Sequence, residues 1–207
     1  MAKEPLQQKP GQQDVPLTTG VILLAAGFSR RFGSIKLNAL LPNGKPLVQQ
    51  TLERIQAATD NVIVVTREEL LASLLQAGAP TEHTLLCPDA DQGMGHTLAC
   101  GMAQVPAHWD AVLVCLADMP FVETRTYTAL LNALRPDAIV VPEHQGKRGN
   151  PVGFGRKWFA QLAQANGDSG GREVMKGNPN AIVKVAVEDP AVHLDVDVPG
   201  DLGQHHV

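Results

Sequence analysis

Short apolar runs alternate along this chain with segments of helical pattern, and that alternation constrains the fold more than any other feature. Near-continuous apolar runs, which are typical of strands buried on both faces, occur at 21–25, 62–65, 85–87, 111–117 and 138–141. Helical patterns lie between them at 46–58, 68–76, 97–104 and 124–134. Buried strands separated by helices predict a parallel sheet that helices cover on both faces.

Beyond residue 142 the alternation loosens into a glycine-rich segment, a helix near 156–164 and an apolar alternation at 182–187. We expect this part to supply an antiparallel strand or hairpin. The predicted fold class is α/β: a single-domain, Rossmann-like three-layer sandwich with a mostly parallel sheet and a small antiparallel extension. Because no repeat or linker divides the chain, we assign residues 20–207 to one domain, and the Gln- and Pro-rich residues 1–19 to a disordered tail.

Composition narrows the classes of partner. The formal net charge of −4 disfavours a nucleic-acid binder, because polyanion binding requires a basic surface. No segment approaches the roughly 20 apolar residues of a membrane helix, and residues 1–19 lack the apolar core of a signal peptide. Cys87, Cys100 and Cys115 show no CxxC spacing and indicate reduced thiols. We therefore expect a cytoplasmic protein with neither nucleic-acid nor membrane partners.

The loop after the strand at 21–25 is the strongest local signal for a site. Ligands of open parallel sheets bind beyond the carboxyl ends of the strands. Small residues let the backbone direct N–H groups at phosphate oxygens, and nearby cations neutralise phosphate charge. The candidate nucleotide-binding residues here are Leu24, Ala25, Ala26, Gly27, Ser29, Arg31 and Lys36. The loop has neither Walker nor GxGxxG spacing, so a tight turn with solvated basic residues is the alternative interpretation.

Two acidic segments are candidates for a metal site. Asp118 follows the buried strand at 111–117 and precedes Met119-Pro120, which places its carboxylate at the ligand crevice. Asp195 and Asp197 lie on one face if their segment is extended. Mg²⁺ prefers carboxylate and phosphate oxygens, so converging carboxylates would suit a metal triphosphate. In the alternative interpretation Asp201 caps a terminal helix and Asp195 is merely exposed.

A glycine-rich loop at 91–97 precedes a predicted helix and is a candidate for contact with a flat base. Its glycines permit close approach, and the start of the helix offers free N–H groups. The residues proposed to bind the nucleotide here are Gly93, Met94, Gly95 and Thr97. An ordinary helix entry is the alternative.

Together these motifs resemble the nucleotidyltransferase superfamily that makes nucleotide sugars, CDP-alcohols and the dinucleotide forms of molybdenum cofactor, and most closely the molybdenum cofactor cytidylyltransferases and their relatives. Residues 24–36 match LAAGxSxRxG…K, 116–120 match LADMP, 195–202 resemble DIDTPEDL, and 93–98 resemble GMGxSL. The resemblance implies a nucleotide-diphospho-sugar transferase-like fold. It makes Arg31, Lys36 and Asp118 catalytic, with Mg²⁺ on Asp118 and Asp197. Ala at position 26 accompanies cytidine nucleotides in this family, and Gly accompanies guanine nucleotides.

Two later segments carry the acceptor side of the resemblance. Residues 148–154 are similar to GHPVLF, and 167–172 to GDxGAR, which implies acceptor contacts for Arg148, Asn150, Pro151 and Arg172. Asn150 stands where His is usual. By resemblance the reaction transfers CMP from CTP to the phosphate of molybdenum-loaded molybdopterin and releases pyrophosphate. The implied partners are CTP, this phosphorylated pterin and a recipient molybdoenzyme, although no residue points to the surface that would meet such an enzyme.

Three alternative functions stay open. A related enzyme would use GTP, or a sugar or alcohol phosphate as acceptor. A nucleotide-binding module without chemistry has less need of paired carboxylates such as Asp118 and Asp197. An NAD-type oxidoreductase would normally carry the GxGxxG motif that this chain lacks.

Overall fold

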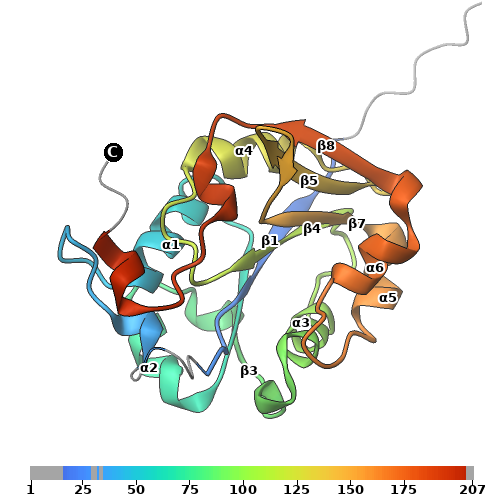
Figure 1. Ribbon diagram of the computed structural model, residues 1–207. Coiled ribbons are helices and arrows are strands. Elements are labelled where there is room, and N and C mark those ends of the chain that lie inside the picture. Colours follow the sequence, from blue (N-terminus) through green and yellow to red (C-terminus); the bar gives the residue numbers. More distant parts are fainter. Residues whose placement is uncertain (1–15, 29–31, 33–34, 204–207) are drawn as a thin grey trace, which may run out of the picture.

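The computed structural model describes residues 16–28, 32 and 35–203 as one α/β domain in three layers (Figure 1). Its strands are β1 Thr19–Leu24, β2 Val62–Thr66, β3 Thr84–Leu86, β4 Ala111–Leu116, β5 Ile139–His144, β6 Lys147–Arg148, β7 Val152–Gly155 and β8 Ile182–Ala186. Its helices are α1 Leu47–Gln56, α2 Glu68–Gln76, α3 Met94–Met102, α4 Thr124–Ala133, α5 Phe159–Leu162 and α6 Arg172–Gly177. The predicted fold class is confirmed.

All eight strands form one sheet in the order β3-β2-β1-β4-β7-β5-β6, with β8 paired to β5. The pairs β2–β3, β1–β2, β1–β4 and β5–β8 are parallel. The helices α1, α2 and α4 cover one face of the sheet, and α3, α5 and α6 cover the other (Figure 1). The carboxyl ends of β1 and β4 are therefore neighbours at one edge of the sheet, where ligands of such folds bind.

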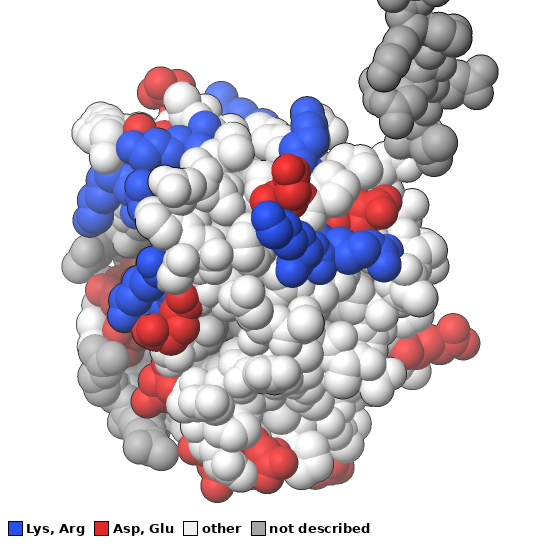
Figure 2. Space-filling model, turned by 90° about the vertical axis from the view of Figure 1, so that its right-hand side faces the viewer, with Lys and Arg blue, Asp and Glu red and all other residues white. Residues whose placement is uncertain are grey.

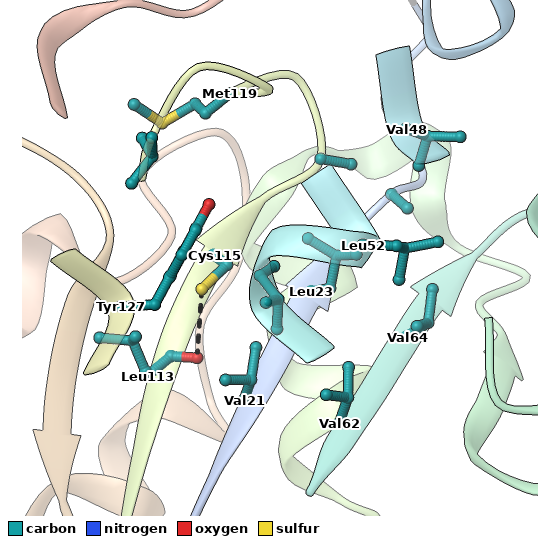
Figure 3. Packing of buried hydrophobic residues seen from close by; sticks show 14 of the residues in the cluster. Val21, Leu23, Val48, Leu52, Val62, Val64, Leu113, Cys115, Met119 and Tyr127 are labelled. Atoms are coloured by element: carbon teal, nitrogen blue, oxygen red, sulfur yellow. Dashed lines mark hydrogen bonds between the residues drawn. The ribbon is translucent and has the colours of Figure 1, made fainter. Parts of the chain in front are cut away.

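Strand alternation explains how one sheet serves two cores. In β1, Val21 and Leu23 pack with Leu52 of α1 on one face, as Figure 3 shows. Ile22 and Leu24 pack on the other face with α3 residues such as Leu98. Because both faces are covered, nearly every side chain in β1, β2 and β4 is buried, which is why these strands are almost continuously apolar.

The part beyond residue 142 supplies an antiparallel strand and a hairpin, as predicted. The apolar alternation at 182–187 is not part of them, because it forms β8, which is parallel to β5. The antiparallel strand is β7, which is inserted between β4 and β5, and the hairpin is β5–β6, which turns at Gln145 and Gly146 with φ of 49° and 78°. The sequence of β7, Val-Gly-Phe-Gly, resembles a loop because two of its four residues are glycine. Its complete burial between two strands overrides that local pattern.

Two boundaries also differ from expectation. The helix α3 begins at Met94 rather than at residue 97, after Gly93 turns the chain with a φ of 115°. At the other end of the domain, β1 begins at Thr19, and the Thr18 amide donates to the Asp110 carboxylate at 2.9 Å. Residues 18 and 19 of the expected tail thus belong to the fold, and residues 1–15 lie outside the described part of the chain.

Acidic and basic side chains lie next to one another on the surface (Figure 2). On the face viewed in Figure 2, lysine and arginine side chains lie beside aspartates and glutamates rather than in one continuous basic strip. Among the described residues, no helix has both the length and the apolar character needed to cross a bilayer.

Candidate active site

A cleft of about 740 Å³ opens at the carboxyl ends of β1 and β4. It brings together motifs that are more than 160 residues apart in sequence. The predicted site residues that line it are Leu24, Ala25, Ala26, Gly27, Lys36, Gly93, Met94, Thr97, Asp118, Arg148, Asn150, Arg172 and Asp197. The predicted residues Ser29 and Arg31 lie outside the described residues.

The loop after β1 forms the floor of the cleft. Ala25 and Ala26 are almost completely buried, and the Ala25 amide donates to the Val65 carbonyl of β2 at 2.8 Å, so the backbone here is fixed to the sheet. Gly27 is exposed, and a Cβ at its position would have no heavy atom within 4 Å. The space over Gly27 is thus open for a ligand to approach the backbone.

Three carboxylates converge at one end of the cleft. Oxygen atoms of Asp118, Asp195 and Asp197 all lie within 4.8 Å of one another. The convergence has a backbone cause: the amide of Val196 donates to the carbonyl of Asp118 at 2.9 Å, and the Val196 side chain is buried. This attachment fastens the segment near the carboxyl terminus to the end of β4 and holds Asp195 and Asp197 close to Asp118.

Lys36 reaches into this acid cluster, which we define as Asp118, Asp195 and Asp197. It comes from a short 3-10 helix, Lys36–Asn38, and is only 8% exposed. Its ammonium lies 2.8 Å from Oδ2 of Asp118 and 3.4 Å from Oδ1 of Asp197. Burial raises the pKa of Asp118, the Lys36 ammonium opposes this, and the Asp195 charge adds to it. A cation beside Asp118 therefore favours its ionised form.

The rim of the cleft near α3 differs in part from expectation. Gly93, Met94 and Thr97 line the cleft as predicted, but Gly95 does not. The Gly95 amide donates to the Gly167 carbonyl at 2.7 Å, and a Cβ on Gly95 would lie 2.4 Å from the Asn166 carbonyl oxygen. Close approach was correctly expected at Gly95, but the group that approaches is the backbone of 166–167 rather than a base.

Replacing Gly95 with Ala should therefore destabilise the fold by about 2 kcal/mol, because the new methyl group overlaps backbone that has little room to move. Nucleotide affinity should also fall, since Met94 and Gly93 next to it form the rim. Thermal unfolding and calorimetric titration with CTP measure the two effects. Gly177→Ala is the matched control, because a Cβ there meets no heavy atom within 4 Å. Equal stability of the two variants would contradict this packing role.

The cleft is also lined by positively charged side chains. Arg148, Asn150 and Arg172 line it as predicted. The Asn150 amide donates to the Val192 carbonyl at 2.8 Å, and Gly149 packs so closely that a Cβ would lie 2.3 Å from the same oxygen. This contact fixes the loop that carries Arg148. Pro151 is buried and does not line the cleft, and its acceptor contact stays a prediction.

Sequence reasoning missed several residues of the cleft, listed here by position: Phe28, Leu37, Gln92, Lys147, Asp168, Val192 and His193. For most of them a signal existed. His193 stands two residues before Asp195, and Asp168 belongs to the same glycine-rich segment as Arg172. The other residues with a signal adjoin predicted site residues in the sequence: Phe28, Leu37, Gln92 and Lys147.

Comparison with known proteins places the chain in a family. Residues 21–184 match the model of the MobA-like NTP transferase domain. The purine catabolism protein PucB of Bacillus subtilis is 31% identical over 189 residues, which are 86% of this chain and 91% of that protein. A molybdenum cofactor guanylyltransferase of Aliivibrio fischeri is 25% identical over 137 residues, 66% of this chain and 68% of that protein.

Solved structures agree on the fold. Rv0371c from Mycobacterium tuberculosis superposes with a TM-score of 0.79 at 24% identity, covering 90% of this chain and 96% of that one. Its complex with manganese gives a TM-score of 0.75 at 22% identity, again covering 90% and 96% of the two chains. The motifs, the cleft and the family match agree, and the chain belongs to the MobA-like NTP transferase domain family as a nucleotidyltransferase.

Proposed function

We propose that this nucleotidyltransferase moves CMP from CTP to the phosphate of molybdenum-loaded molybdopterin and releases pyrophosphate. The observation that carries the proposal is one cleft that holds two unlike groups of side chains. Lys36 and the acid cluster form one group, and the cations Arg148 and Arg172 form the other. A metal-bound triphosphate suits the first group, and an anionic acceptor suits the second.

The residues that would hold Mg²⁺ are Asp118 and Asp197, with Asp195 beside them. The donor set fits a hard divalent cation, because it consists of three carboxylates within 4.8 Å of one another. When bound, the ion would neutralise charge on the triphosphate and orient it.

The residues of the protein would act by positioning the two substrates and by neutralising the negative charge of the triphosphate. An oxygen of the acceptor phosphate attacks the α-phosphorus of CTP, a new P–O bond forms, and the bond to the β-phosphate oxygen breaks with release of pyrophosphate. A phosphate is already ionised near neutral pH, so the attack needs no general base. Arg31 and Lys36 would stabilise negative charge on the triphosphate, and Arg148 and Arg172 would hold the acceptor in line.

The choice of CTP rests on Ala26. This residue lines the cleft and is only 2% exposed, so a nucleotide would meet a wall that carries a methyl group. A related enzyme that uses GTP is the rival, since the Aliivibrio fischeri relative is a guanylyltransferase. The proposal includes a cytoplasmic location and delivery of the product to a recipient molybdoenzyme.

Pyrophosphate release tests this proposal with Mg²⁺, molybdenum-loaded molybdopterin and each of CTP, GTP, ATP and UTP in turn. We expect release with CTP that depends on the acceptor. Release with GTP instead would indicate a guanylyltransferase. CTP binding without release for any nucleotide would indicate another acceptor or a binding module without chemistry.

The two arginines proposed to bind the acceptor give a separate prediction. Arg148→Ala and Arg172→Ala should each raise KM for the acceptor roughly tenfold, because each removes a charged hydrogen-bond donor, and KM for CTP should change little. Initial-rate kinetics with each substrate varied in turn make the comparison. Lys176→Ala is the matched control: it lies on α6 with Arg172 but pairs with Glu173 at 2.9 Å and does not line the cleft. An equal rise in KM for CTP would contradict the assignment of these two arginines to the acceptor.

A further inference from the structure

Lys36 contacts the acid cluster directly. Its ammonium bridges Asp118 and Asp197, at 2.8 and 3.4 Å. The Lys36 side chain is 10% exposed and that of Asp118 is 24% exposed. These are the two carboxylates that the proposed function assigns to the metal, so Lys36 and a divalent cation would compete for the same oxygens.

Repulsion among the carboxylates of the acid cluster explains why a cation beside them is favourable even without a metal. Three ionised carboxylates within 4.8 Å of one another repel strongly in a partly buried site. A single ammonium neutralises one of the three charges and hydrogen-bonds two of the three groups. Lys36 thus supplies in the free protein part of the charge that a divalent cation would supply in full.

The side chain is also able to leave. Lysine carries its charge on a flexible four-carbon stem, and Lys36 lines the cleft beside Ala26 and Gly27. Among the described residues, its ammonium donates hydrogen bonds to Asp118 and Asp197. Rotation about the side-chain bonds would let it move from these carboxylates to a nearby phosphate.

We propose that Lys36 is an exchangeable counter-ion of the acid cluster. In the free protein it occupies the cluster and weakens metal binding. When nucleotide enters, its phosphates attract the Lys36 ammonium, Asp118 and Asp197 are released for the metal, and metal and nucleotide therefore bind with positive coupling. This inference rests on the proposed function, because it takes the acid cluster as the metal site.

Manganese titration in the absence of nucleotide, followed by electron paramagnetic resonance of free Mn²⁺, tests the exchange. Lys36→Met keeps the length of the side chain and removes its charge, so Mn²⁺ should bind roughly tenfold more tightly than to the unmodified protein. The matched control is Lys45→Met, which removes a lysine paired with Glu53 outside the cleft. This control should leave the Mn²⁺ affinity unchanged.

Thermal unfolding provides a second measurement that does not depend on turnover. Lys36→Met should lower the Tm without metal, because the acid cluster loses the Lys36 ammonium, and Mn²⁺ should raise the Tm of this variant more than that of the unmodified protein. A folded Lys36→Met protein that binds Mn²⁺ equally or more weakly would overturn the exchange, because Lys36 would then support the metal site rather than occupy it.

Asp118→Asn separates this failure from that of the proposed function. In the Lys36→Met background it should abolish the gain in Mn²⁺ affinity. If Mn²⁺ binding exists but does not depend on Asp118, or if neither protein binds Mn²⁺, the metal assignment itself is wrong and the exchange falls with it. If binding depends on Asp118 but not on Lys36, only the exchange is wrong.

Discussion

Asp118→Asn is expected to lower kcat by on the order of 10³-fold while the protein remains folded. Asp118 stands at the carboxyl end of β4, where it joins the acid cluster and accepts a hydrogen bond from Lys36 at 2.8 Å. Asparagine keeps the shape and one acceptor oxygen but removes the charge that a metal and Lys36 both require. Because the charge rather than the volume changes, the loss should appear in kcat and leave the unfolding temperature nearly unchanged.

Steady-state kinetics and circular dichroism of the purified variant measure these two quantities. Asp137→Asn is the charge-matched control, since Asp137 is exposed, precedes β5 at the opposite end of the sheet and does not line the cleft. It should retain full activity. An Asp118→Asn enzyme that keeps a kcat within a few-fold of the control would show that the acid cluster does not hold the catalytic metal.

Asp189→Ala should produce the largest loss of stability, about 3 kcal/mol of the free energy of unfolding. Asp189 is 2% exposed and accepts hydrogen bonds from the amide of Glu123 at 2.9 Å, the hydroxyl of Thr126 at 2.6 Å and the amide of Ala191 at 3.0 Å. Alanine leaves these three donors without an acceptor in a site closed to water. The contacts join α4 to the segment that leads to Val192 and the acid cluster, so the loss extends to the site.

Chemical denaturation gives the free energy, and a scan should show a Tm lower by roughly 6–12 °C for a chain of this size. Asp189→Asn should cost less, because its carbonyl oxygen still accepts hydrogen bonds. Asp60→Ala, at an exposed position, serves as the control for removing an acidic side chain. A change below 1 kcal/mol in Asp189→Ala would mean that these donors find other partners.

The fold was predictable where burial leaves a local pattern. The strand β4 and the helix α2 could be assigned because an apolar run or a helical repeat was complete within each segment. The strand β7 could not be assigned, since Gly153 is present for a reason that only packing reveals: a Cβ there would lie 2.3 Å from Cδ2 of Leu134. The parallel pairing of β8 was equally hidden, because its exposed and half-buried residues resemble those of any edge strand.

The candidate site, like the fold, was predictable from the sequence only in part. Motif order placed Lys36, Asp118 and Asp197 in one cleft, because the carboxyl ends of neighbouring strands must meet. It did not predict that Lys36 would sit among the carboxylates, which depends on side-chain distances rather than on spacing. At Gly95 the sequence could not show which group approaches, because close approach of a ligand and close approach of backbone require the same residue.

Transfer of a cytidylyl group can be measured by following the phosphorus atoms of CTP. The protein is incubated with Mg²⁺, molybdenum-loaded molybdopterin and CTP labelled at the α- or the γ-phosphate. We expect α-label to move into a product that contains both the pterin and cytidine, and γ-label to leave as pyrophosphate. Label from the γ-position in the acceptor, or α-label that stays in CTP and CMP, would contradict this expectation.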